Sequence, residues 1–477
     1  MALAGRLSAY VFRIYCQLAT GQWTVSNDTL CHAVSMTTHY IPLTNLPDGD
    51  DLSQATSTNP RQVKSWRLPK RWLSALLFIC GLFTILLLSG SWSSSSGKRQ
   101  QTPSSQDESS TLFLLGQHED PTKLWFPPIS SGANFQPSVA SYNEPPPIER
   151  RLRTPLFVAF TRNNAMLHQT VLSYIASGWP REDIIVVDNS GTMDANNLGL
   201  LSHDNPFFLD YEILRRRYGV SILQTPTLLN FSQLMNFYLR VSIAHRWRYF
   251  FWSHMDVAVL SDEEARPYKS FYERVLGILS ELGISSLNAV DGAANSDGST
   301  WAIKYFSYDW LTLVNVAAWR KIGQWDTFIP YYGSDCDAYS RVVLNGFTKD
   351  DVRAGRIFDL PSAITDPEAK FFPPSVDKSS SGETSTDSGL NSKRYQTLFA
   401  ELQKLESEKP EHHRNQWQSS DKGGRGEPWT YDPQGFQQMW WDTADIGREL
   451  YKKKWGTSEC RLDEHGVTLS DEWRGEP

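Results

Sequence analysis

Short apolar runs alternate with helical patterns through the middle of this 477-residue chain, and this alternation constrains the fold more than any other feature. The runs LFVAF (156–160), IIVVD (184–188) and VSILQ (220–224) have the length and the β-branched content of buried strands. Between such runs, apolar residues recur at helical spacing, as in the segment from Phe231 to His245. Strands that alternate with helices predict right-handed βαβ units and a mostly parallel sheet, so we expect an α/β domain over residues 151–375.

Acidic residues stand where several of these predicted elements begin or end. Asp188 ends the run IIVVD, and Asp256 follows the run YFFWSHM. Asp335 and Asp337 lie in YYGSDCDAYSR, at the predicted start of a helix. In open α/β sheets, ligands bind beyond the carboxyl ends of the strands. We therefore expect these carboxylates to form part of a functional site.

Four stretches of the chain carry a family resemblance. They occur in the order FVAFTRNN, IIVVDNSGT, a helix bearing Asn236 that leads into FFWSHMDVAV, and IGQWDTFIPYYGSDCDAYSR (322–341). In this order they resemble the motifs of the GT-A glycosyltransferases, particularly the family-2-like enzymes. The last stretch is the most specific match, because six of its residues fall in register: Gly323, Asp326, Phe328, Asp335, Asp337 and Arg341. The resemblance covers less than half of the chain and implies a Rossmann-like GT-A fold for that part.

The resemblance implies a transferase that moves a hexose from a nucleotide-sugar donor to a hydroxyl group of a glycan or glycoconjugate, with inversion at the anomeric carbon. A carboxylate within hydrogen-bond reach of that hydroxyl can take its proton as the general base. By the family pattern Asp335 is this base, and Asp337 is a supporting acid or the alternative base. The positions that match donor-binding residues are Thr161, Arg162, Asp188 and Asn236.

The stretch His254-Met255-Asp256 stands where those enzymes carry a DxD-type metal motif. The resemblance implies that Asp256, with His254, binds Mn²⁺ or Mg²⁺, and that this cation stabilises the charge on the leaving diphosphate. The sequence departs from the family at His254, which replaces the first aspartate, and at Ser334, which replaces the acid before Asp335. Imidazole is an acceptable ligand for Mn²⁺, although carboxylate suits this ion better.

Each of these acids also has an ordinary structural interpretation. Asp256 and Asp188 are acceptable as strand-end or turn residues. Asp335 and Asp337 are acceptable as acids that favour a helix N-terminus. Two other functions therefore stay open: a membrane-tethered glycan-binding or scaffold protein without catalysis, and a retaining transferase or nucleotide-sugar hydrolase on the same fold.

The segment WLSALLFICGLFTILLLSGSW (72–92) contains no charged residue, and its 21 residues are enough to cross a bilayer as a helix. Cations concentrate on its N-terminal flank, at Arg61, Lys64, Arg67, Lys70 and Arg71. This bias predicts a cytosolic N-terminus and a lumenal body. We expect a single-pass type II membrane protein of the Golgi.

The remaining segments are assigned from composition. We expect a cytosolic tail over 1–71 that starts at Met1 or Met36, a flexible Ser- and Pro-rich stem over 93–150, a disordered loop over 376–394 and a C-terminal helical extension over 395–477. The net charge of −7 argues against a nucleic acid partner, because binding phosphates requires a basic surface. No oligomeric state follows from these features.

Two further features fall in the predicted lumenal part. Cys336 and Cys460 are the only cysteines there, so the sequence allows one disulfide, although the place of Cys336 between two motif aspartates also suits a buried thiol. Aromatic residues cluster in STWAIKYFSYDW (299–310). Their alternatives are a place in the core and a surface on which an acceptor sugar stacks.

Overall fold

The computed structural model describes residues 124–130, 135–288, 300–372, 389–409, 423–427 and 433–474, all within the unit Gln106–Pro477. The predicted cytosolic tail, the predicted membrane span at 72–92 and most of the predicted loop at 376–394 lie outside these residues. Among the described residues, no helix combines the length and the hydropathy needed to cross a membrane.

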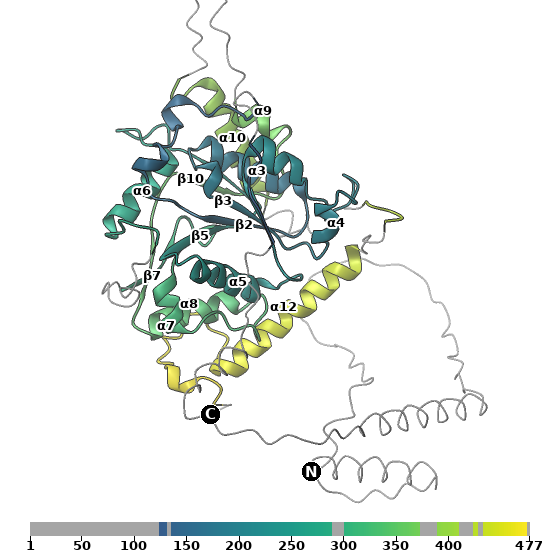
Figure 1. Ribbon diagram of the computed structural model, residues 1–477. Coiled ribbons are helices and arrows are strands. Elements are labelled where there is room, and N and C mark those ends of the chain that lie inside the picture. Colours follow the sequence, from purple (N-terminus) through teal and green to yellow (C-terminus); the bar gives the residue numbers. More distant parts are fainter. Residues whose placement is uncertain are drawn as a thin grey trace, which may run out of the picture. The chain divides into compact units, whose positions relative to one another are not determined.

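An eight-stranded sheet runs through the domain in the order β1-β4-β3-β2-β5-β8-β7-β9 (Figure 1). Its strands are β1 (Trp125–Phe126), β2 (Leu156–Phe160), β3 (Ile184–Asp188), β4 (Ser221–Gln224), β5 (Tyr249–Ser253), β7 (Trp301–Tyr305), β8 (Leu311–Asn315) and β9 (Thr348–Asp351). The neighbours β4, β3, β2 and β5 are parallel, which confirms the predicted α/β domain with a mostly parallel sheet. β8 runs antiparallel to β7 because residues 306–310 are too few for a parallel crossover.

A second, two-stranded sheet is formed by β6 (Val257–Leu260) and β10 (Arg356–Asp359), which pair antiparallel. The apolar stretch around Asp256 is therefore not one strand. β5 ends at Ser253 in the main sheet and β6 begins at Val257 in the small one, so residues 254–256 form the connection between the two sheets. Asp359 pairs with Val257 in this register and so lies beside Asp256.

Helices cover both sides of the main sheet. In the view of Figure 1, α3, α9 and α10 lie on one side, and α5, α7 and α8 lie on the other. The helices are α3 (Asn164–Ala176), α4 (Met193–Asn197), α5 (Phe231–Ala244), α6 (Phe271–Glu281), α7 (Val316–Ile322), α8 (Ser334–Leu344), α9 (Pro367–Phe371), α10 (Lys393–Glu408) and α12 (Pro433–Trp455), with short helical turns η1 (Ser141–Asn143), η2 (Ile148–Arg150), η3 (Arg181–Asp183), η4 (Ile213–Tyr218) and η5 (Leu469–Asp471).

The core lies between the sheet and these helices and is rich in aromatic side chains. Phe157 of β2 stacks on Tyr238 of α5, with 4.5 Å between ring centroids, and both are fully buried. Burying one such side chain contributes about 1.5–3 kcal/mol to folding. The apolar runs seen in the sequence are thus strands buried on both faces.

Residues that the composition assigned to the flexible stem pack on the domain. β1 pairs antiparallel with β4, with Trp125 opposite Leu223. Further along, a Cβ on Gly178 would lie 2.4 Å from the carbonyl oxygen of Asn143, and Gly178 has a φ of +93°. A proline-rich stretch without periodicity can lie in extended form against a sheet edge, so composition alone placed the domain boundary too late in the chain.

The C-terminal helix α12 packs on α8 through a small apolar cluster separate from the main core. In it, Tyr451 and Trp455 of α12 and Leu462 lie against Ile329. Beside this cluster, Cys336 of α8 forms a disulfide with Cys460, with 4.7 Å between the two Cα atoms. Of the two alternatives for Cys336, the structure therefore shows the disulfide.

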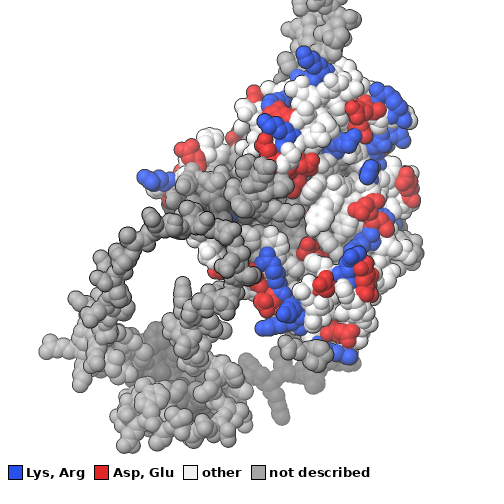
Figure 2. All heavy atoms as spheres, turned by 180° about the vertical axis from the view of Figure 1, so that it is seen from behind, with Lys and Arg blue, Asp and Glu red and all other residues white. Residues whose placement is uncertain are grey.

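Figure 2 shows lysine and arginine side chains interspersed with aspartate and glutamate on the face opposite to that of Figure 1. No continuous basic area covers the described part of this face.

Candidate active site

A cavity of about 460 Å³ opens at the carboxyl ends of β2 and β5. Thr161 and Arg162 directly follow β2, and His254 directly follows β5. The wall is completed from distant parts of the chain, by Asp309, Tyr331, Asp335, Asp359, Lys409 and Trp440 among others. Of the residues selected from the sequence, the structure thus brings Thr161, Arg162, His254, Asp256 and Asp335 to one cavity.

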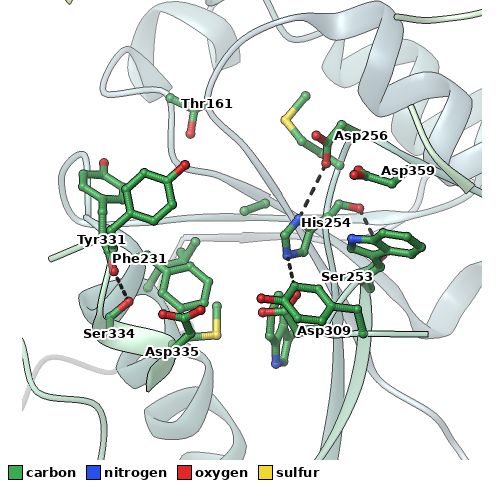
Figure 3. A pocket seen from close by; sticks show the side chains of 18 of the residues that line it. Thr161, Phe231, Ser253, His254, Asp256, Asp309, Tyr331, Ser334, Asp335 and Asp359 are labelled. Atoms are coloured by element: carbon green, nitrogen blue, oxygen red, sulfur yellow. Dashed lines mark hydrogen bonds and ion pairs between the residues drawn. The ribbon is translucent and has the colours of Figure 1, made fainter. Parts of the chain in front are cut away.

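His254 lies between two carboxylates (Figure 3). Its Nδ1 is 3.7 Å from Oδ1 of Asp256, and its Nε2 is 3.7 Å from Oδ1 of Asp309. Burial lowers the pKa of His254, but the two carboxylates outweigh this effect and raise the pKa to about 9. This arrangement therefore favours the protonated form of the imidazole.

Asp256 also contacts a second cation, the ammonium group of Lys409. Nζ of Lys409 is 3.1 Å from Oδ2 of Asp256 and donates another hydrogen bond to Asp359. Burial raises the pKa of Asp256, but His254 and Lys409 outweigh it and hold that pKa below its usual range. Burial lowers the pKa of Lys409, and the two carboxylates outweigh it in turn. These interactions favour the charged forms of Asp256, His254 and Lys409.

The surroundings of Asp256 do not fit a resident divalent cation. An oxygen ligand must offer a lone pair at about 2.0–2.2 Å from Mg²⁺ or Zn²⁺ and similar ions. Here both oxygens of Asp256 face cationic groups, and Asp359 is bonded to the same ammonium. Within the described ranges, no group of three or more His, Cys, Asp or Glu side chains is placed to hold a metal ion.

Asp335 faces the cavity from the first turn of α8. In Figure 3 it lies across the cavity from Asp256. Burial raises its pKa, and Asp309 raises it further, while the backbone N–H of Cys336 works in the opposite direction. A carboxylate with a raised pKa and access to a cavity has the properties of a general base.

The backbone before Asp335 is held in place by glycine. Gly333 has a φ of +88°, which other residues rarely adopt. A Cβ on this residue would also lie 3.0 Å from Cβ of Tyr451 in α12. The backbone turn before α8 and the close contact of this turn with α12 therefore both depend on Gly333.

Asp337 does not line the cavity, although the sequence analysis gave it a catalytic role. Its side chain is fully buried and binds Arg341 one turn later, with 2.9 Å between Nε and Oδ2. Its other oxygen is 2.8 Å from Nζ of Lys454 and 2.9 Å from Nε1 of Trp455, both in α12. Since α8 turns by about 100° per residue, side chains two positions apart point in different directions. This places Asp337 in the contact between α8 and α12.

Asp188 and Asn236 also lie outside the cavity wall. Asp188, at the end of β3, is buried and accepts hydrogen bonds from the backbone N–H of Ser190 and, at 2.8 Å, from the hydroxyl group of Tyr211. Burial raises the pKa of Asp188, and these hydrogen bonds partly offset the effect. The amide of Asn236 bonds both the N–H and the carbonyl of Trp325. Both side chains therefore organise the backbone near the site.

Aromatic rings form one side of the cavity and extend beyond it. Trp440 of α12 lines the cavity, with its ring centroid 5.5 Å from that of Tyr332. Trp441 stacks on the same tyrosine at 6.4 Å, and 40% of its surface is exposed. Of the aromatic stretch 299–310, Tyr308 and Trp310 line the cavity, whereas Trp301 is buried in the core.

Asp309, Asp359 and Lys409 also line the cavity, although they were not predicted from the sequence. Asp359 had a usable signal, because it ends the apolar run RIFD in the same way that Asp188 ends IIVVD. Asp309 lies within an aromatic stretch, and Lys409 follows a segment rich in charged residues, so neither position stood out in the sequence.

No protein-family profile matches this chain, and no curated protein matches it. Thirty chains of solved structures match it by fold. One is the mannosyltransferase PcManGT from Pyrobaculum calidifontis in complex with GDP-Man and Mn²⁺, at a TM-score of 0.27 and 14% identity, with 46% of this chain and 58% of that chain covered. Another is TarS of S. aureus, at a TM-score of 0.26 and 7% identity, with 46% and 38% covered. The chain thus spans 58% and 38% of the lengths of these proteins, and at such TM-scores the likeness carries no argument about its function.

Proposed function

We propose that this chain is a glycosyltransferase that moves a hexose from a nucleotide-sugar donor to a hydroxyl group of a glycan or glycoconjugate. The observation that carries the proposal is the cavity at the carboxyl ends of β2 and β5. In it, the carboxylate of Asp335 lies across from Asp256, which contacts His254 and Lys409, and aromatic rings line its side. The four sequence motifs, which resemble those of GT-A enzymes and occur in the same order, indicate the class of reaction.

The proposed reaction is a direct displacement at the anomeric carbon. The acceptor oxygen forms a bond to that carbon while the bond from carbon to the diphosphate oxygen breaks, and its electron pair stays on the diphosphate. The acceptor proton passes to the carboxylate of Asp335. One displacement of this kind inverts the configuration of the anomeric carbon. The raised pKa of Asp335 makes the ionised carboxylate a better proton acceptor than an exposed aspartate.

The donor would lie along the loop that follows β2. Arg162 is 3% exposed and lines the cavity beside Thr161, so its guanidinium charge would lie close to the donor diphosphate at a site largely shielded from water. The donor-binding positions taken from the family resemblance thus reduce to these two, because Asp188 and Asn236 are engaged outside the cavity wall.

The acceptor would lie on the aromatic side of the cavity. The apolar faces of a sugar ring pack on aromatic rings, and Trp440, Tyr308 and Trp310 offer such rings at the cavity wall. The acceptor would then lie between α12 and the loop after β7.

The Golgi lumen is the proposed location. A disulfide is typical of proteins that fold in an oxidising compartment, and Cys336–Cys460 is of this kind. The apolar segment at 72–92 would anchor the chain in the membrane as a type II protein.

The test is a screen of the full-length chain for binding and turnover of nucleotide sugars, with oligosaccharides as acceptors. Donor binding is measured by calorimetry and nucleotide release by a coupled assay. Asp335→Asn is expected to bind the donor normally and to lose transfer, and NMR of the product is expected to show inversion. Binding of glycans without binding of any nucleotide sugar would support the non-catalytic alternative instead.

A further inference from the structure

We propose that the ammonium group of Lys409 takes the place of the divalent cation expected at Asp256, so that this chain holds its donor diphosphate without a metal ion. The inference rests on the proposed function and specifies the chemistry of its donor site. Its first support is position. The ammonium bridges Asp256 and Asp359, and all three side chains line the cavity.

The bridge is shielded from water. The side chain of Lys409 is 9% exposed, as is that of Asp256, and the side chain of Asp359 is 17% exposed. A surface lysine exchanges its partners freely, but breaking the ion pairs of a lysine at this depth would leave charges shielded from water without partners. The ammonium is therefore a fixed part of the cavity wall.

The helix that carries Lys409 is anchored to β10. Leu398 and Leu402 of α10 are buried in the main core. Phe399 packs on Phe358 of β10 with 5.6 Å between centroids, and the carboxylate of Glu406 accepts a hydrogen bond from the backbone N–H of Asp359. Lys409 directly follows this helix, and its own N–H bonds the carbonyl of Glu406. The contacts of α10 with the main core and with β10 thus hold the ammonium group against Asp256.

The hydrogen-bonding capacity of the ammonium fits a phosphate ligand. A lysine ammonium has three N–H donors and no acceptor. Within the described part of the chain, two of these donors are directed to Asp256 and Asp359. The third is available to a diphosphate oxygen in the cavity, where charge accumulates as the leaving group departs. A metal ion bound to Asp256 would instead face a positive charge next to its ligand.

The first experiment uses Mn²⁺ as the probe, with electron paramagnetic resonance of free Mn²⁺ as the readout. The full-length wild-type chain is expected to leave an equimolar Mn²⁺ signal unchanged. Lys409→Ala is expected to bind one Mn²⁺ per chain, because Asp256 and Asp359 are released from the ammonium. Lys404→Ala, in the exposed part of the same helix, is the matched control and is expected to behave as the wild type.

The second experiment uses GDP and UDP as probes in calorimetry, with chelator or with added Mn²⁺. Wild-type affinity is expected to be the same under both conditions. Lys409→Met, which keeps the length of the side chain without its charge, is expected to weaken binding by about 10-fold to 100-fold. Thermal unfolding of each variant shows whether it is folded.

The outcomes distinguish a failure of the role proposed for Lys409 from a failure of the proposed function. Uptake of one Mn²⁺ by the wild type, abolished in Asp256→Asn and accompanied by a loss of nucleotide affinity on chelation, would overturn the role of Lys409. If the wild type binds neither nucleotide nor any nucleotide sugar under either condition, the proposed function fails, while the Mn²⁺ titration still decides whether Lys409 excludes the metal.

Discussion

Asp335 and Asp337 stand two positions apart at the start of α8, yet Asp335 lines the cavity and Asp337 is enclosed by the contact with α12. The two carboxylates are therefore expected to respond differently to the same substitution. Asp335→Asn should lower kcat by about 10²–10⁴-fold, because it removes the general base. The stability of the Asp335→Asn protein should stay at or above that of the wild type.

Asp337→Asn should show the opposite pattern. It leaves the charges of Arg341 and Lys454 buried without their shared carboxylate, a change that costs about 3–5 kcal/mol. Urea unfolding is the measurement for both variants. Equal stability of the two variants, or loss of kcat in a folded Asp337→Asn protein, would contradict this division of roles.

The pH dependence of activity should report Asp335. Its pKa is raised by burial and by Asp309, and the base acts when ionised. The rate should therefore fall as the pH decreases, with a midpoint above the usual aspartate value of about 3.9. Because the folded state favours the protonated form, the carboxyl stabilises the protein below the usual pKa, and this contribution is lost as the pH rises through the raised pKa. Profiles of kcat/KM and of stability for the wild type and Asp335→Asn test both statements.

The Cys336–Cys460 disulfide should stabilise the site as well as the fold. It closes a long loop, since its cysteines are 124 positions apart in the sequence, and such cross-links typically contribute about 2–4 kcal/mol. Cys336→Ser, Cys460→Ser and the double variant should therefore be destabilised to the same extent. Reductant should lower the melting temperature of the wild type alone. A further loss in the double variant would mean that one cysteine has another role.

Substitution of Trp440 should weaken the binding of the acceptor and leave the binding of the donor unchanged. Trp440→Ala removes an aromatic ring from the cavity wall, so the KM for the acceptor should rise by about 2-fold to 10-fold while the donor affinity stays unchanged. Ile446→Ala is the control, since Ile446 is exposed on the same helix. An effect of Trp440→Ala on the donor affinity instead would move the acceptor to another part of the cavity.

The parallel part of the sheet could be predicted because its strands are short, apolar and separated by helical patterns. Each of these signals is local, and LFVAF and IIVVD form β2 and β3 with the expected bounds. The break at residues 254–256 could not be predicted in the same way. It depends on the pairing of β6 with β10, and these strands are brought together by folding across almost one hundred residues.

Lys409 shows why part of the site escaped prediction. A lysine at the end of a polar helix is usually exposed, and no local pattern marks this one as different. Its partners Asp256 and Asp359 lie 153 and 50 residues away in the sequence. Asp337 is the opposite case. Its motif suggested a catalytic role, but its buried contacts with α12 give it a structural role.

The location of Lys409 and Trp440 in the sequence has a consequence for truncating mutations. Every strand of both sheets is complete by Asp359, whereas the ammonium, the indole and Cys460 come from the last part of the chain. A premature stop codon or a frameshift after β10 would leave the sequence of both sheets intact and remove one wall of the cavity. Such alleles are expected to behave as null alleles, even where a truncated protein accumulates.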